Sequence, residues 1–364
     1  MSSVALQRPL RYASRALVFG GVAFVLGWIL FYARSTNFGP FIHDQRNFTI
    51  TLLNGITFAA LLFIVASGFS LIFGLMRVVN MAHGSFYLLG GYIAYEVQQG
   101  MTGQGFAIPS TNVTTWEWVA PLLVAASIIG VVGLIVQQVF LRWNQGQDLR
   151  QALITIALSV IAADQVVAHF PRHVPAGALR FGGIAVSLTW PGWTDRFVNL
   201  HVFGVQYSLQ RLVMLALGVS VGIGLWVWLY KTRTGTIIRA GVDDREMTSA
   251  LGVNIQRTFA LAFIVGSSLA AFGAVVGGSQ AGISSAVDGQ WLLNSLVVVI
   301  IGGMGSIFGA VAGSLLYGLV FSFSAVYLPT TSDNCYAQYS IVFTFALLAL
   351  VLAFRPQGLF GRAG

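Results

Sequence analysis

The chain has 364 residues, of which 56% are hydrophobic and only 8% are charged. A soluble domain has roughly 25% charged residues, so this composition excludes a soluble globular enzyme, and its hydrophobicity excludes a disordered chain. The 19 Lys and Arg residues outnumber the 11 Asp and Glu residues, giving a net charge of +8. We assign this excess to loops at a membrane surface rather than to a nucleic-acid-binding face.

Apolar runs along the chain predict about eight to ten transmembrane helices, and hence an all-α, polytopic membrane helix bundle. Ten runs are present. They lie near residues 16–33, 50–76, 78–97, 119–141, 152–167, 209–230, 258–282, 291–302, 306–328 and 340–354. The run 291–302 is shorter than the roughly 20 residues of a straight crossing, so we expect it to form a broken or re-entrant hairpin with the run that follows.

The first run follows a basic lead made of Arg8, Arg11 and Arg15. It is longer than the apolar part of a usual cleaved signal peptide, so we expect a retained helix within an N-terminal extension, residues 1–48. With the N-terminus inside, 13 of the Lys and Arg residues fall in inner segments and 6 in outer segments. This asymmetry predicts that both termini are cytoplasmic.

Two long loops separate the runs. The outer loop, 168–208, contains two alternating stretches, Ile184 to Trp190 and His201 to Ser208. These stretches predict two short strands within a cap on the outer face. The inner loop, 231–257, is rich in charged residues.

The inner loop contains a short amphipathic segment. Its acidic residues stand where a helix would begin and suit the helix dipole, and its apolar residues recur at helical spacing on one face. The acidic residues are Asp243, Asp244 and Glu246, and the apolar ones are Met247, Ala250 and Leu251, followed by Gly252 as a helix stop. A partner protein would bury this face. A solvated hairpin held by local charges explains the same residues equally well.

Five segments, in order along the chain, resemble the permease subunits of branched-chain amino acid ABC importers. They are NGIT (Asn54 to Thr57), VNMAHGSFYLLGGY (Val79 to Tyr92), the inner loop, IGGMGSIFGAVAG (Ile301 to Gly313) and RPQGLFGR (Arg355 to Arg362). In the inner loop the matching positions are Gly235, Arg239, Ala240, Asp243, Asp244, Met247, Ala250, Leu251, Gly252 and Asn254. Asn294 stands where many relatives have Lys, and Gly282 to Ser285 lack a Pro often found nearby. These departures concern the cargo rather than the family.

The resemblance implies a permease domain, residues 49–362, that forms the translocation path for branched-chain or other hydrophobic amino acids. Urea and short-chain amides are the alternative cargo. The inner loop would couple the chain to an ATPase. The implied coupling residues are Arg239, Asp243, Asp244, Arg245, Glu246, Met247, Ala250, Leu251 and Gly252.

The chain has no G-x-x-x-x-G-K-[ST] motif, which ATP-hydrolysing partners carry. We therefore expect no enzymatic activity and no cofactor in this chain, with ATP bound by two partner ATPase subunits. The resemblance also implies a second permease subunit, related or identical, an extracytoplasmic solute-binding protein, membrane lipid, and no nucleic acid. The implied location is the bacterial cytoplasmic (inner) membrane.

Polar groups inside the apolar runs are candidates for the path, because such groups are costly in lipid and usually face a bundle interior or a water-filled cavity. The candidates, with glycines where a helix can bend, are Asn54, Asn80, His83, Gly84, Gln280, Asn294, Gly303 and Ser306. Asn80 and His83 are three residues apart and can share a helix face. A hydrogen-bonded packing pair is the alternative. No Cys or His pair has metal-ligand spacing, and no catalytic constellation is present.

The chain contains an apparent internal duplication. TFAALLFIVASG (Thr57 to Gly68) resembles TFALAFIVGSS (Thr258 to Ser268), and the two would cross the membrane in opposite directions. This predicts an inverted repeat with the pathway between its halves. A self-sufficient secondary transporter is the second hypothesis, and it needs an intramembrane carboxylate. Asp164 is the one acid inside a predicted run away from its end, and we expect it at the outer interface.

Overall fold

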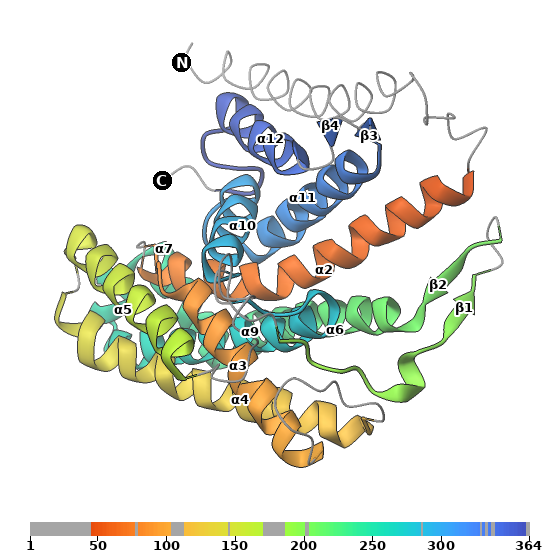
Figure 1. Cartoon of the computed structure of the whole chain (residues 1–364). Coiled ribbons are helices and arrows are strands. Elements are labelled where there is room, and N and C mark those ends of the chain that lie inside the picture. Colours follow the sequence, from red (N-terminus) through yellow and green to blue (C-terminus); the bar gives the residue numbers. More distant parts are fainter. Residues whose placement is uncertain are drawn as a thin grey trace, which may run out of the picture.

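The computed structural model describes residues 45–76, 79–102, 113–144, 146–169, 186–200, 204–284, 287–327, 330–331, 334–335 and 339–361. The expected first crossing, 16–33, and most of the extension 1–48 lie outside the described residues, as does much of the cap 168–208. The described part is a bundle of helices with two small hairpins (Figure 1).

Eleven α-helices are described, in chain order. They are α2 (Gln45–Met76), α3 (His83–Thr102), α4 (Thr115–Ile135), α5 (Asp148–His169), α6 (Leu209–Lys231), α7 (Arg233–Asp243), α8 (Arg245–Ala250), α9 (Ile255–Ala281), α10 (Val287–Gly302), α11 (Ile307–Tyr327) and α12 (Ser340–Phe354). A π-helical turn, Val136–Leu141, and a 3₁₀ turn, Arg142–Asn144, extend α4. Strand β1 (Phe197–Asn199) pairs antiparallel with β2 (Gln206–Ser208), and β3 (Thr330–Thr331) pairs with β4 (Asn334–Cys335).

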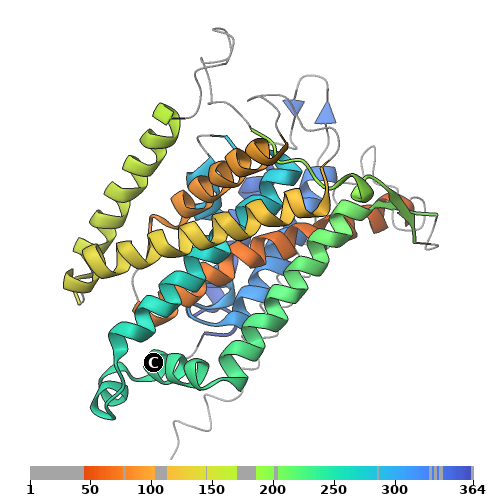
Figure 2. The ribbon, with the colours of Figure 1, turned by 90° about the horizontal axis from the view of Figure 1, so that it is seen from below.

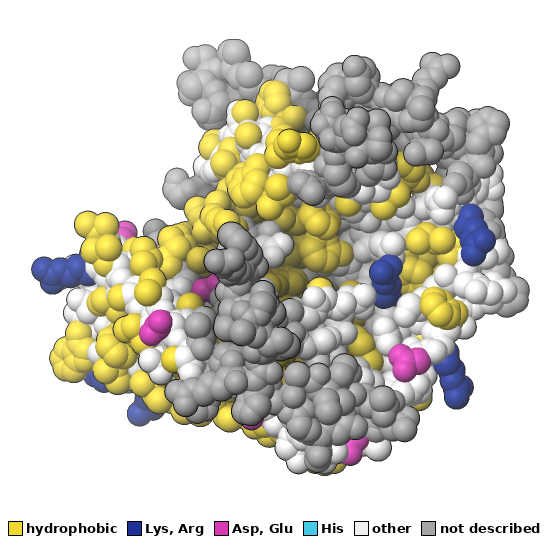
Figure 3. Space-filling view, in the orientation of Figure 1, with side chains coloured by type: hydrophobic (Ala, Val, Ile, Leu, Met, Phe, Trp, Pro, Cys, Tyr) yellow, Lys and Arg dark blue, Asp and Glu magenta, His cyan; other side chains and the backbone are white. Residues whose placement is uncertain are grey.

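Each of the nine predicted runs within the described residues contains a helix. Six helices, α2, α4, α5, α6, α9 and α11, are long and apolar enough to cross a membrane, whereas α10 and α12 are shorter. The run 78–97 became α3, which lies outside those six but is mostly buried among other helices. Protein therefore replaces lipid around α3. Figure 3 shows hydrophobic side chains over much of one face, with Lys and Arg mainly toward its two ends.

The packing of the helices follows the predicted duplication. α2 and α9 pack against each other, and each also packs against one helix of the other half: α2 against α11, and α9 against α4. The contacts α3–α4 and α3–α9 have counterparts in α10–α11 and α10–α2. Leu75 at the end of α2 and Ile255 at the start of α9 belong to one buried cluster, so these two helices run in opposite directions. The predicted inverted repeat is confirmed.

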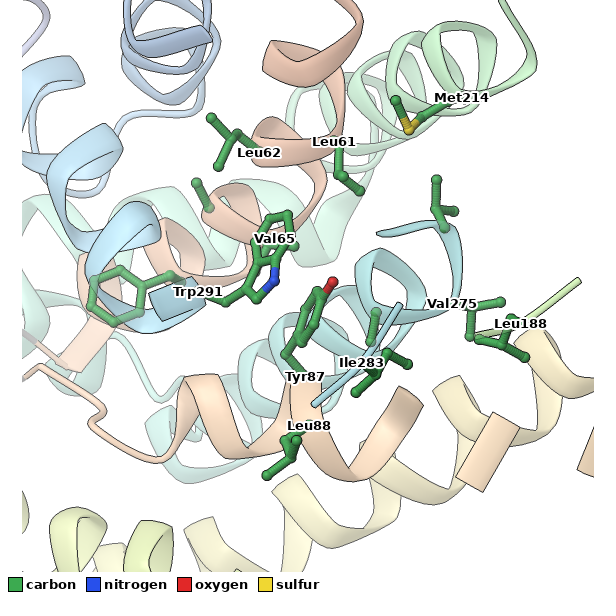
Figure 4. Close-up of a cluster of buried hydrophobic side chains, with 14 of the residues drawn as sticks. Leu61, Leu62, Val65, Tyr87, Leu88, Leu188, Met214, Val275, Ile283 and Trp291 are labelled. Atoms are coloured by element: carbon green, nitrogen blue, oxygen red, sulfur yellow. The ribbon is translucent and has the colours of Figure 1, made fainter. Parts of the chain in front are cut away.

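The two helices α7 and α8 define one end of the bundle, which we call the inner end; the opposite end is the outer end. α5 diverges from the rest of the bundle near the inner end, as the view from below shows (Figure 2). The largest buried cluster joins α2, α3, α9, α10 and α11 at the centre (Figure 4).

Part of the expected outer cap enters the bundle. Val186 and Ile283 exchange two main-chain hydrogen bonds of 2.8 and 2.7 Å. The Gln98 side chain donates to the Thr189 carbonyl oxygen at 3.0 Å and accepts from the Thr189 N–H at 2.9 Å. The bundle thus provides the hydrogen bonds that a second strand would otherwise provide.

The strand prediction for this cap is partly wrong. Within the described residues of Ile184 to Trp190, only Val186 forms a β-bridge, because the segment is bonded to helix ends instead of a neighbouring strand. The second predicted stretch does contain a strand, β2, at Gln206–Ser208. Its partner β1 lies at Phe197–Asn199, between the two predicted stretches.

Candidate functional site

α3 begins beside the middle of α2, not at its end. The His83 ring nitrogen Nε2 lies 3.0 Å from the Val65 carbonyl oxygen. Val65 precedes the last residue of α2, Met76, by 11 positions, which is about 16 Å along a helix. A bilayer core is about 30 Å thick. α3 therefore starts about 16 Å outward from the inner end of α2, roughly half of that thickness.

The contact with Val65 also fixes the protonation of His83. A carbonyl oxygen only accepts, so Nε2 must carry the hydrogen and Nδ1 is an acceptor in the neutral ring. The ring is fully buried and packs edge-on against Phe69, with centroids 5.3 Å apart. Among the described residues Nδ1 has no hydrogen-bond partner.

α10 begins at the same depth as α3. A Cβ atom on Gly84 would overlap the main-chain oxygen of Asp288, so the two helix starts are in direct contact. One turn further, the rings of Tyr87 and Trp291 are stacked with centroids 4.5 Å apart and planes 20° from parallel. Figure 4 shows this pair between α3 and α10, close to Val65.

The two contacts join one repeat to the other, Gly84 and Tyr87 of α3 to Asp288 and Trp291 of α10. We call the region formed by these four residues, His83 and the described residues 79–82 and 282–284 the central junction. Helices that start inside a membrane at a repeat interface are typical of transporter binding sites.

Besides His83 and Gly84, two more of the predicted path residues lie at the central junction: Asn80 is part of it, and Asn294 is next to it. Asn80 is only 3% exposed; its Oδ1 accepts from the Ala82 N–H at 3.1 Å, and its Nδ2 has no partner among the described residues. Asn294 is buried on α10, and its Oδ1 accepts a 2.8 Å hydrogen bond from the Tyr317 hydroxyl. Asn294 thus ties α10 to α11.

The other predicted path residues lie elsewhere. Gln280 is exposed at the end of α9, close to residues 282–284. Gly303 and Ser306 form the inner turn between α10 and α11, where the Ser306 hydroxyl accepts from the Gly309 N–H at 3.0 Å. Gly303 has φ +104° and contacts Gly361, so a side chain there would be strained and would clash with the C-terminal segment.

Asn54 belongs to an outer cluster on α2 and α6. It accepts a hydrogen bond from the Arg211 guanidinium. Nearby, the Thr57 hydroxyl donates to the Leu53 carbonyl oxygen and lies 2.8 Å from the Tyr207 hydroxyl, so Tyr207 is the donor of that bond. Burial raises the pKa of the Tyr207 phenol, an effect that the positive charge of Arg211 opposes. The predicted path residues therefore occupy three levels and do not form one site.

Sequence reasoning missed two residues near the junction. Asp288 and Ser295 share a stripe of α10 with Leu292, at spacings of four and three residues. Since Asp288 and Leu292 both contact Gly84, Ser295 continues that stripe toward the inner end. Ser295 is fully buried, and its hydroxyl has no partner among the described residues. Asp288 precedes the apolar run, and the hydropathy pattern therefore placed it in a loop.

The inner loop forms two helices, where the pattern predicted one. α7 begins at a cap in which the Thr232 hydroxyl accepts from the Gly235 N–H at 3.1 Å. Ile238 of α7 is buried in one cluster with Leu75 of α2 and Phe259 of α9. Any displacement of α7 therefore acts on the inner ends of both central helices.

α8 presents its apolar face to solvent. The Asp244 carboxylate caps the helix by accepting from the Met247 N–H at 2.9 Å. Met247 is 60% exposed and Leu251 is 77% exposed. Gly252 follows with φ +82°, which favours glycine at a helix end. An exposed apolar pair at the inner end is a surface that a protein partner can bury.

The remaining predicted coupling residues surround this pair. Ala250 is exposed on α8, while the Arg239 guanidinium lies 4.5 Å from the centre of the Tyr230 ring and holds α7 against α6. The backbone of Asp243 ends α7, and Arg245 and Glu246 begin α8.

These features define a multi-pass helical membrane protein with an inverted repeat. The family described as "Branched-chain amino acid transport system / permease component" matches residues 51–352, and the chain belongs to that family. The match begins after the expected first crossing.

Named relatives agree with this assignment. The chain is 30% identical to the high-affinity branched-chain amino acid transport system permease protein BraD of Pseudomonas aeruginosa, over 85% of this chain and 95% of the relative. It is 28% identical to LivH of Salmonella typhimurium, over 85% and 94%. The solved structure "PsaBC from Streptococcus pneumoniae in complex with Fab" aligns over 86% of this chain and 94% of that chain, with a TM-score of 0.44 and 10% identity.

Proposed function

We propose that the chain is one permease subunit of an ABC importer that carries branched-chain or other hydrophobic amino acids. Family membership supports the role, and the names of the relatives support the cargo. Urea or short-chain amides are the alternative cargo. A self-sufficient secondary transporter has less support, because the family that the chain belongs to is a permease component of a transport system.

The observation that carries the proposal is the exposed pair Met247 and Leu251 on α8. α8 follows α7 directly, and α7 is packed on the inner ends of α2 and α9. An ATPase bound to this pair would move α7, and the movement would reach the crossing of the two repeats. Alternating access requires that the ATPase bind the inward-open and outward-open states with different affinities, because a partner that binds both equally does not shift the equilibrium between them. Contact through α8 and α7 provides a route for that difference.

The same proposal sets the partners and the orientation. Two ATPase subunits bind ATP at the inner end, which is then the cytoplasmic face of a bacterial inner membrane. The C-terminal segment lies at this end, because Leu359 N–H donates to the Ile301 carbonyl oxygen at 2.9 Å. A second permease subunit completes the path, and a solute-binding protein delivers cargo at the outer face. The chain hydrolyses no ATP itself and holds no cofactor.

The test is ATP-driven leucine uptake into proteoliposomes containing the importer assembled from this chain, its ATPases, its second permease subunit and its binding protein. We expect the double substitution Met247→Asp and Leu251→Asp to abolish ATPase co-purification and uptake. Asp244 is left intact so that α8 keeps its cap. Leu149→Asp, at an equally exposed position on α5, is the matched control and should retain both. Retention of ATPase and uptake by the double variant would refute the coupling role of α8.

A further inference from the structure

Asp288 places a carboxylate inside the bundle, short of its outer end. α10 runs outward from Gly302 for 16 residues, about 24 Å, which is shorter than a bilayer core of about 30 Å. Its outer start contacts Gly84 of α3, beside the His83 that reaches the middle of α2. A charged side chain at this depth normally faces a water-filled cavity or an opposite charge.

The Asp288 carboxylate has no partner of its own among the described residues. No hydrogen bond or ion pair with it occurs there, although the side chain is half-buried. Gly289 and Gln290 next to it are exposed, and a Cβ atom on Gly289 would meet nothing within 4 Å. Asp288 therefore stands at an open edge of α10, with exposed residues directly after it.

We propose that Asp288 binds the α-ammonium group of the amino acid as it passes the central junction. The inference rests on the proposed function, which provides a cargo with a positive charge and an apolar side chain. The Tyr87–Trp291 pair lies one turn along α10, where its two rings are buried against each other in the core. A carboxylate and an ammonium group at this depth relieve each other's cost of leaving water.

An acid in the first turn of a helix also stabilises the helix through its dipole, which would be a purely structural role. The two roles differ in what they change. Loss of a structural role lowers stability and all activities together. Loss of cargo binding lowers the amount of amino acid carried per ATP hydrolysed while leaving the assembly intact.

The experiment measures leucine uptake, ATP hydrolysis and thermal stability of the full complex in proteoliposomes with saturating leucine-loaded binding protein. We expect Asp288→Asn to lower the ratio of leucine carried to ATP hydrolysed at least tenfold, with the unfolding temperature unchanged. Asp288→Glu keeps the charge and should restore most of the ratio. Asp164→Asn, at an exposed acid of α5, is the control and should behave as the native chain.

The outcomes separate the two proposals. A native ratio in Asp288→Asn, or an equal loss in Asp288→Glu, overturns the role of Asp288. A fall in unfolding temperature with a proportional loss of uptake and hydrolysis shows a structural role and overturns it too. If the native complex carries no amino acid with ATP, the proposed function itself is wrong.

Discussion

Gly68 of α2 and Gly266 of α9 face each other where the two central helices cross. A Cβ atom on either one would overlap the carbonyl oxygen of the other. Small residues at membrane helix crossings allow backbones to approach closely. The same crossing joins the two repeats, so their relative position depends on these two glycines.

Gly68→Ala is therefore expected to destabilise the folded chain by about 1–3 kcal/mol, because an extra carbon in a packed core forces backbone shifts. Thermal unfolding in detergent, followed by tryptophan fluorescence, measures the effect. Gly224→Ala is the control, since a Cβ atom on that residue of α6 would meet nothing within 4 Å. Equal unfolding temperatures for the two variants would contradict the close crossing.

Asp244 is expected to act as a helix cap, independently of any contact with an ATPase. Asp244→Ala removes the acceptor for the Met247 N–H and should cost about 1 kcal/mol of local helix stability. ATPase affinity should fall, because the exposed pair on α8 is then held less firmly. Asp244→Asn keeps a capping oxygen and should retain affinity. Binding of purified ATPase to the detergent-solubilised chain measures both, and a loss in the Asn variant would show that the charge itself matters.

The stacked pair of Tyr87 and Trp291 is expected to hold the central junction together. Trp291→Ala should destabilise the chain by about 3–5 kcal/mol through the cavity it leaves, whereas Trp291→Phe keeps an aromatic ring and should cost less. Unfolding temperature is the measurement. Comparable losses for Tyr87→Ala alone and for the double Ala variant would show that the two side chains act as one unit, while strict additivity would speak against a direct contact.

Gln98 is expected to hold the outer segment against the bundle. Gln98→Leu leaves the Thr189 N–H and carbonyl group without their side-chain partner, at a cost of about 1–3 kcal/mol per buried group. Hydrogen–deuterium exchange at residues 186–190 should accelerate. Glu96→Gln, an exposed position two residues earlier, is the control. Exchange that is unchanged in the Leu variant would mean that the Val186–Ile283 bridge alone anchors the segment.

Local patterns predicted the helices well because hydropathy and turn residues act over short distances. Every apolar run in the described residues contains a helix, and the acidic residues, apolar face and glycine of the inner loop marked α8. The same patterns misplaced the start of α10. Asp288 and Gly289 are poor candidates for a membrane segment by composition, but the chain enters the membrane there because α3 and the outer segment surround it.

The sequence by itself determined the class of protein, the order of the apolar helices that the structure describes, the duplication and the surface helix at the inner end. Only the tertiary structure decided that the starts of α3 and α10 meet inside the bundle. The reason is that this meeting depends on close packing between residues some 200 positions apart, as at Gly84 and Asp288. Whether a polar residue faces lipid, water or another helix follows from such contacts and not from its neighbours along the chain.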